Sequence, residues 1–213
     1  MEWLLEGAEP IIYGLQILAG VYGSFCAILI YRKIKQKSFS TPAKATEFLN
    51  EVRALLERRD FDGIAELCDS PPYWSKATPQ LILVALAYRD RGLNKLRQLL
   101  AEKYERDVVA DLDYRAAWMA TIVKIAPMLG LLGTSTGMIR AFASLAGAKG
   151  GVDPLVLAEK ISIALYSTAL GLAIAVGMTV LGSAVHVRKG KLTDAVQEQL
   201  SEFLYDLEKA MRT

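Results

Sequence analysis

The sequence predicts an all-α membrane protein with three transmembrane helices, two of which extend into a cytoplasmic helical bundle. Apolar residues make up 53% of the 213 residues, a fraction that favours a membrane protein. Two uncharged runs, residues 11–31 and 161–185, hold 21 and 25 residues, and each is long enough to cross a hydrocarbon core about 30 Å thick. A third apolar region, residues 116–145, is long enough if Lys124 snorkels or faces protein.

The charges beside these regions predict the order and orientation of six segments. Lys and Arg follow the first and third runs and precede the central region, whereas acidic residues lead the chain. Because positive charge marks the cytoplasmic side, we expect the N-terminus outside and the C-terminus in the cytoplasm. The leading acids also argue against a cleavable signal peptide. The expected segments are an outer N-terminus with the first transmembrane helix (1–31), a cytoplasmic helical region (32–115), the second transmembrane helix (116–145), a short outer loop (146–155), the third transmembrane helix (156–187) and a cytoplasmic C-terminal helix (188–213).

The first span contains one strongly polar side chain, Gln16. Its simpler interpretation is that the helix is a lipid-facing anchor. A role in a pore is the alternative, since amides inside a membrane usually find a neighbouring helix.

The region after the first span reads as short helices with apolar residues at helical spacing. One covers residues 43–59, with Pro42 at its first position behind Thr41, and a second covers residues 61–68. Thr78 and Pro79 repeat this pattern of a capping threonine followed by proline and predict a third helix over residues 80–88. This helix is too short to span a membrane, so we expect it at the buried centre of the cytoplasmic layer.

Two long helices are expected to carry the remaining spans. From Leu93 onward nothing breaks the apolar stripe, which predicts one helix of roughly 50 residues that enters the membrane. Pro127 should kink it locally. Asp153 and Pro154 predict the start of the second long helix, which continues into the tail, with Gly190 as a candidate bend.

Both of the later spans carry a stripe of small and hydroxyl residues. In lipid, helices associate through such residues because burial of leucine gains little there, so we expect the two stripes to face one another. The plain alternative for the threonines is a hydrogen bond to a carbonyl one turn back in the same helix. The first stripe is Gly130, Gly133, Thr134 and Gly137, and the second is Ala164, Thr168, Gly171 and Ala175.

The residue types present argue against several classes of function. Two cysteines and one histidine offer no metal-ligand spacing, and no nucleophile–base pair or phosphate-binding loop is evident. The basic residues flank membrane spans and form no continuous patch for nucleic acid. We therefore expect no enzymatic activity, no cofactor, no metal and no nucleic-acid partner.

Two sequence blocks carry a resemblance to a known family. Residues Ala126 to Phe142 read A-P-x-L-G-L-L-G-T-x-x-G-M-I-x-A-F, and residues Ala164 to Ala175 read A-L-x-x-T-A-x-G-L-x-x-A. Together with the expected topology, these blocks resemble the MotA/TolQ/ExbB proton-channel family, and three spans in a short chain are similar to its ExbB/TolQ-like branch.

The resemblance implies a homo-oligomeric ring, pentameric in known members, in the bacterial inner membrane. The ring would surround a smaller single-span partner of the ExbD/TolR type, whose membrane aspartate accepts protons. Thr134 and Thr168 would line the ion path, and the gradient would drive energy-dependent transport or envelope work. No acid lies at mid-depth in the chain's own spans, which agrees with a carboxylate supplied by the partner.

One departure from the family pattern concerns the third span. Where ExbB and TolQ proteins often have a glutamate, this chain has Ile163. Glu159 lies one turn earlier and is a candidate for the outer entrance, or it simply benefits from the helix dipole and pairs with a lysine. The departure leaves open whether the ion is a proton or sodium, and whether the chain is instead a non-conducting scaffold of the same architecture.

Overall fold

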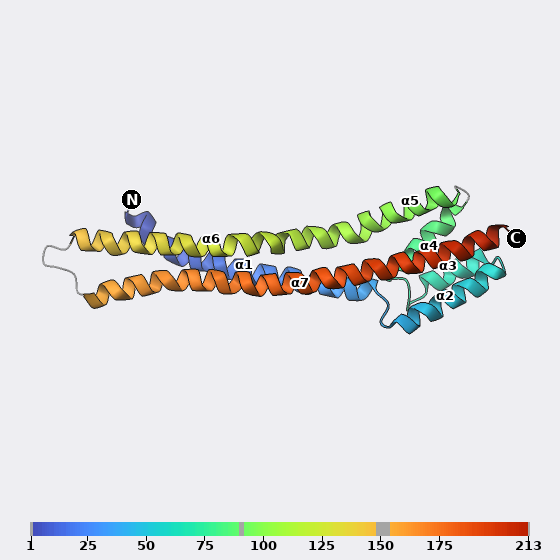
Figure 1. Ribbon diagram of the computed structural model, residues 1–213, viewed down its shortest axis with the longest axis horizontal. Helices are drawn as coiled ribbons and strands as arrows, with labels where there is room; N and C mark the ends of the chain where they lie inside the picture. The colour runs from blue at the N-terminus through green and yellow to red at the C-terminus, as the bar shows by residue number, and fades with distance from the viewer. Residues whose placement is uncertain (1, 90–91, 148–153, 213) are drawn as a thin grey trace. The chain divides into compact units, whose positions relative to one another are not determined.

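The computed structural model describes residues 2–89, 92–147 and 154–212, and these residues form helices and no strand (Figure 1). This confirms the all-α prediction. The elements in chain order are α1 (Glu2–Lys37), α2 (Pro42–Glu57), α3 (Phe61–Asp69), α4 (Ala77–Ala87), α5 (Leu93–Tyr104), the π-helical turn η2 (Glu105–Val109), α6 (Ala110–Gly147) and α7 (Pro154–Arg212). The expected outer loop and the Asp153 cap fall largely on residues 148–153, outside the described residues.

The chain divides into two compact units. The first, here called the span unit, consists of Met1–Ile28 and Arg115–Ala184. The second, here called the bundle unit, consists of Leu29–Tyr114 and Val185–Thr213. Helices α1, α6 and α7 contribute residues to both units.

Three helical stretches are long and apolar enough to cross a membrane, as the sequence predicts. Only 22–28% of the most apolar window of each stretch is buried. Large side chains such as Leu18, Met128 and Val176 are therefore exposed on the outside of the span unit. An apolar exterior of this kind suits a lipid environment, and the chain is a multi-pass membrane protein. The three stretches are Pro10–Glu57, Leu93–Leu145 and Pro154–Met211.

The bundle unit has an aliphatic and aromatic core built by the short helices and the C-terminal part of α7. Phe48 of α2, Ile64 of α3, Ile82 of α4 and Phe203 of α7 are almost fully buried. The expected helices over residues 43–59 and 61–68 are therefore present as α2 and α3. The third short helix, α4, is largely buried within the bundle unit, as expected, and its cytoplasmic location stays a prediction.

The third short helix, expected over residues 80–88 behind Thr78 and Pro79, starts three residues earlier than predicted. The helix begins at Ala77, with Lys76 as its N-cap. The Thr78 hydroxyl does not cap the helix but donates to Oε1 of Gln199 on α7, 2.5 Å away. A tertiary partner has replaced the local cap that the sequence suggested.

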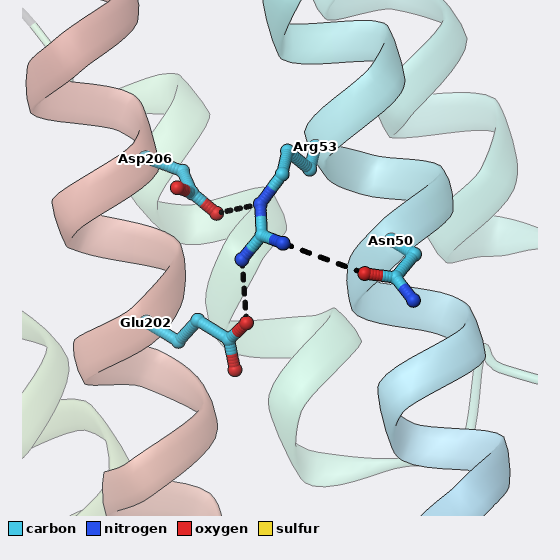
Figure 2. A network of polar contacts seen from close by, with 4 residues as sticks. All are labelled: Asn50, Arg53, Glu202 and Asp206. Atoms are coloured by element: carbon cyan, nitrogen blue, oxygen red, sulfur yellow. Dashed lines mark hydrogen bonds and ion pairs between the residues drawn. The ribbon is translucent and has the colours of Figure 1, made fainter.

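Arg53 links α2 to α7 at the surface of the bundle unit (Figure 2). Its Nε lies 2.7 Å from Oδ2 of Asp206, and one terminal nitrogen lies 2.6 Å from Oε1 of Glu202. The other terminal nitrogen is 3.5 Å from Oδ1 of Asn50 on its own helix. The guanidinium thus contacts two carboxylates one turn apart on α7, a geometry that arginine can satisfy and lysine cannot.

The helix that starts at Leu93 is continuous in the structure, with one local change of geometry. It runs through α5, η2 and α6, and η2 is a π-helical turn that the sequence analysis missed. A π turn shifts the helix face, which allows the neighbours Val108 and Val109 both to be buried. Pro127 lies inside α6 and α7 continues through Gly190, so a kink at the first and a bend at the second stay predictions.

Candidate ion-pathway site in the span unit

The two small-residue stripes lie at the contact between α6 and α7. A Cβ atom added to Gly130 would lie 2.8 Å from Cα of Thr168 and 2.9 Å from the carbonyl oxygen of Ser167. A Cβ atom at Gly133 would lie 2.7 Å from Cβ of Ser167, and one at Gly171 would meet the carbonyl oxygen of Ala126. These distances are too short for real contacts, so only glycine permits the two backbones to approach this closely.

The other small residues of the stripes are also buried. Ala164 and Ala175 of α7 are less than a tenth exposed, and Gly137 of α6 is buried as well. The first span packs against the same helices through Gly23, where an added Cβ would lie 2.6 Å from Sδ of Met178.

Ser167 provides a hydrogen bond across the α6–α7 contact. It is 2% exposed, and its Oγ lies 3.0 Å from the carbonyl oxygen of Gly130 and 2.8 Å from that of Ala164. The hydroxyl has one proton, so the two carbonyls share it. Ser167 was not among the predicted site residues, although a serine beside Thr168 on a small-residue face is the signal that could have identified it.

The two threonines differ in their hydrogen bonding. Oγ1 of Thr134 donates to the carbonyl oxygen of Leu131, 2.8 Å away, which is the intrahelical bond of the plain alternative. Oγ1 of Thr168 is buried and has no hydrogen-bond partner among the described residues. Thr168 therefore offers a free hydroxyl inside the span unit, whereas the Thr134 hydroxyl is already engaged.

Gln16 occupies the centre of this site, although the same helix exposes large apolar side chains such as Leu18, as a lipid-facing anchor would. The side chain is 0% exposed, and its Nε2 donates to the carbonyl oxygen of Ser167, 2.9 Å away. Gly130 and Gly171 provide the space, since Cβ atoms added there would lie 3.4 and 2.9 Å from the same Nε2. Its Oε1 is buried without a partner among the described residues. The amide has found a neighbouring helix, as amides in lipid do.

The residues near the expected outer entrance are exposed, unlike this buried cluster. Ile163 is 40% exposed, and its carbonyl oxygen accepts a hydrogen bond from Oη of Tyr13 at 2.8 Å. Glu159 is exposed. Position 163 therefore presents an apolar side chain, and the nearest acid of this helix, Glu159, is at its surface.

The cluster of Gln16, Ser167 and Thr168 contains neutral hydrogen-bonding groups and no charge. Its oxygen acceptors can accept hydrogen bonds from a protonated group, but the cluster cannot carry a charge itself. Among the described residues, no group of three or more His, Cys, Asp or Glu side chains is placed to hold a metal ion.

These features define a polytopic helical membrane protein whose spans meet through glycines around buried polar groups. A model of the MotA/TolQ/ExbB proton channel family matches residues 78–198, more than half of the chain. The chain therefore belongs to this family, and the resemblance carried by the two sequence blocks is confirmed.

Individual relatives support the ExbB/TolQ-like branch. The chain is 50% identical over 153 residues to biopolymer transport protein exbB1 of Vibrio cholerae serotype O1, covering 71% of this chain and 67% of that protein. It is 38% identical over 180 residues to an ExbB homologue of Methanothermobacter thermautotrophicus, covering 84% and 60%. It is 30% identical over 96 residues to the Tol-Pal system protein TolQ of Haemophilus influenzae, covering 45% and 40%. The chain thus spans about two thirds or less of the length of these relatives.

Proposed function

We propose that this chain is the ring-forming subunit of an inner-membrane complex that couples an ion gradient to transport or envelope work. The observation that carries the proposal is the pair of unpartnered polar atoms buried in the span unit, Oε1 of Gln16 and Oγ1 of Thr168. A buried group without a partner costs about 1–3 kcal/mol, so keeping both is best explained by a function. The proton-channel family and the biopolymer transport names of the relatives support the same role.

In the proposed mechanism, Thr134 and Thr168 line the ion path and Glu159 lies near its outer entrance. Gln16 acts as a positioning residue, because its amide nitrogen donates to the Ser167 carbonyl next to Thr168. The hydroxyl and amide groups are neutral and Glu159 is exposed, so we propose that another chain supplies the carboxylate that takes the proton. A single-span partner of the ExbD/TolR type, with an aspartate in its membrane helix, supplies it.

The proposed assembly is a homo-oligomer, in the simplest case a pentamer, with each N-terminus outside and each C-terminus in the cytoplasm. The exposed apolar side chains of the span unit are available both to lipid and to neighbouring copies. The glycines at positions 130, 133 and 171 would fix each subunit internally, so that motion occurs between ring and partner.

The second candidate is a non-conducting membrane scaffold with the same architecture. Ile163 favours it, because an exposed isoleucine stands where related proteins often have a glutamate. A chain that has lost this carboxylate could keep the ring without the relay.

The test is ion flux in proteoliposomes that contain the purified chain with and without its single-span partner. We expect proton flux only with the partner, and loss of at least nine-tenths of it in Thr168→Val. The matched control is Thr179→Val on the same helix, whose hydroxyl already donates to the carbonyl oxygen of Ala175, 2.8 Å away. Flux that depends on sodium would show that the transported ion is sodium and not the proton. Absence of any flux with a bound partner would favour the scaffold.

A further inference from the structure

The bundle unit contains a cavity of about 550 Å³ between the end of α1, the start of α2 and the adjoining part of α7. Its wall has two different parts. One part is basic and includes Lys35 and Lys37 of α1 with Arg188 and Lys191 of α7. The other is apolar and includes buried Ile34 and Leu192. The wall is therefore amphipathic, with its cations beside the ends of two transmembrane runs in the sequence.

Among the described residues, no ion pair joins the cations of this wall to Glu198 or Glu202 of the same wall. The cavity also contacts Glu198 and Glu202, but Glu202 is turned toward Arg53, 2.6 Å away (Figure 2). Lys37 donates to the neutral amide oxygen of Gln80 at 2.6 Å. Burial lowers the pKa of Lys37, and the nearby charge of Lys33 lowers it further, as expected where positive charges crowd together.

Other cations beside the same spans are paired, and the contrast is informative. Lys33 lies 2.8 Å from Oδ2 of Asp111, and Lys189 forms an ion pair with Asp113. Both acids stand on α6, so these two pairs tie the helices of the bundle unit together. Lys35 and Lys191 have no such acid among the described residues, which leaves their charge available to a ligand.

Arg188 is held at the membrane end of the cavity by an aromatic ring. Its guanidinium carbon lies 4.4 Å from the ring centroid of Tyr31, a cation–π contact that fixes the side chain. Lys191 is three residues further along α7 and so shares a face with Arg188. Tyr31 ends the first uncharged run, at the level where aromatic residues meet lipid headgroups.

We propose that this cavity binds the phosphate of an anionic phospholipid headgroup. Arg188, Lys35 and Lys191 would contact the phosphate, while the apolar wall would accept the glycerol and the first part of an acyl chain. Basic pockets at the ends of transmembrane helices are suited to such headgroups. The lipid-binding proposal rests on the membrane placement of the chain and not on ion conduction. Failure of the lipid-binding proposal would therefore leave the proposed ion conduction standing, and failure of ion conduction would leave lipid binding standing.

The test is lipid retention by the full-length protein, measured by native mass spectrometry after exchange into detergent with phosphatidylglycerol or phosphatidylcholine. We expect retention of phosphatidylglycerol at least tenfold above phosphatidylcholine. We expect the triple variant Lys35→Gln, Arg188→Gln, Lys191→Gln to lose that preference. The matched control is Lys44→Gln, Arg58→Gln, Lys95→Gln, which removes the same charge at exposed positions outside the cavity.

Three results would overturn the proposal. Equal retention of the two lipids means that the cavity does not read the charge of the headgroup. Equal loss in the two triple variants means that net charge alone attracts the lipid. Full displacement of phosphatidylglycerol by glycerol phosphate, at the same affinity, means that a soluble phosphate compound is the ligand. Thermal unfolding of both triple variants checks that they remain folded.

Discussion

Different interactions stabilise the inside of the span unit and the inside of the bundle unit, although helices α1, α6 and α7 contribute residues to both. In the span unit the contact between helices is made by Gly130 and Gly171 around a buried amide, and large apolar side chains point outward. In the bundle unit large apolar side chains such as Phe48 point inward, and ion pairs occupy the surface. The difference follows from the solvent, since burial of apolar surface stabilises a protein in water but contributes little in lipid.

The largest effect should come from filling the glycine contact of the span unit. Gly130→Leu would drive a side chain into the backbone of α7, where Cα of Thr168 and the Ser167 carbonyl cannot give way. We expect loss of folded protein in detergent, measured by size-exclusion chromatography and thermal unfolding. Gly177→Leu is the matched control because an added Cβ there meets nothing within 4 Å. Normal folding of Gly130→Leu would show that this contact does not fix the span unit.

Truncation of an aromatic side chain should have a large effect in the bundle unit only. Phe48 is 0% exposed, and Phe→Ala in a core typically costs about 3–5 kcal/mol. We expect Phe48→Ala to lower the free energy of unfolding by that amount. Phe142→Ala, at an exposed position in the span unit, should change it little. Chemical denaturation that reports on each unit separately would measure both changes. Equal losses in Phe48→Ala and Phe142→Ala would contradict the expected difference between the units.

The buried thiol of Cys68 should make the bundle unit less stable at high pH. Burial raises the pKa of Cys68 from 9.0 to about 12. Because the folded state favours the neutral thiol, its contribution is complete below pH 9 and is lost as the pH rises toward 12, at about 1.4 kcal/mol per pH unit. We expect the free energy of unfolding to fall more steeply between pH 9 and 10.5 in the wild type than in Cys68→Ala. Parallel pH profiles would contradict this.

The smallest effect should come from the ion pairs of the bundle surface. The Arg53 side chain is 39% exposed, and solvent screening limits such pairs to about 1 kcal/mol or less. We expect Arg53→Met to lower the free energy of unfolding by that amount at low salt and by less at high salt. Denaturation at two ionic strengths measures both values. A loss of several kcal/mol would mean that Arg53 is essential to the α2–α7 contact.

Helical spacing was enough to predict most of the fold. The apolar stripes of α2 and α3 and the continuous helix from Leu93 depend on local sequence, which carries this information directly. The start of α4 and the π turn at Glu105–Val109 depend on tertiary partners, such as Gln199 for Thr78. No local pattern can specify those partners, so these two features were missed or misplaced.

The candidate site was less accessible to sequence reasoning than the fold. The small-residue stripes identify one face of each helix but do not say which hydroxyl is already bonded, and only the coordinates separate Thr134 from Thr168. A single glutamine in an apolar run is equally compatible with lipid exposure and with burial. The position of Gln16 depends on Gly130 and Gly171, which are more than a hundred residues away in the chain.

The most direct measurement is the paired determination of stability and partner-dependent proton flux for Thr168→Val. Valine has nearly the shape of threonine and removes a buried hydroxyl that lacks a partner, so we expect unchanged or higher stability, by up to about 1 kcal/mol, together with loss of flux. That combination assigns the hydroxyl to function and not to folding. Full flux in a stable Thr168→Val protein would contradict the proposed ion path.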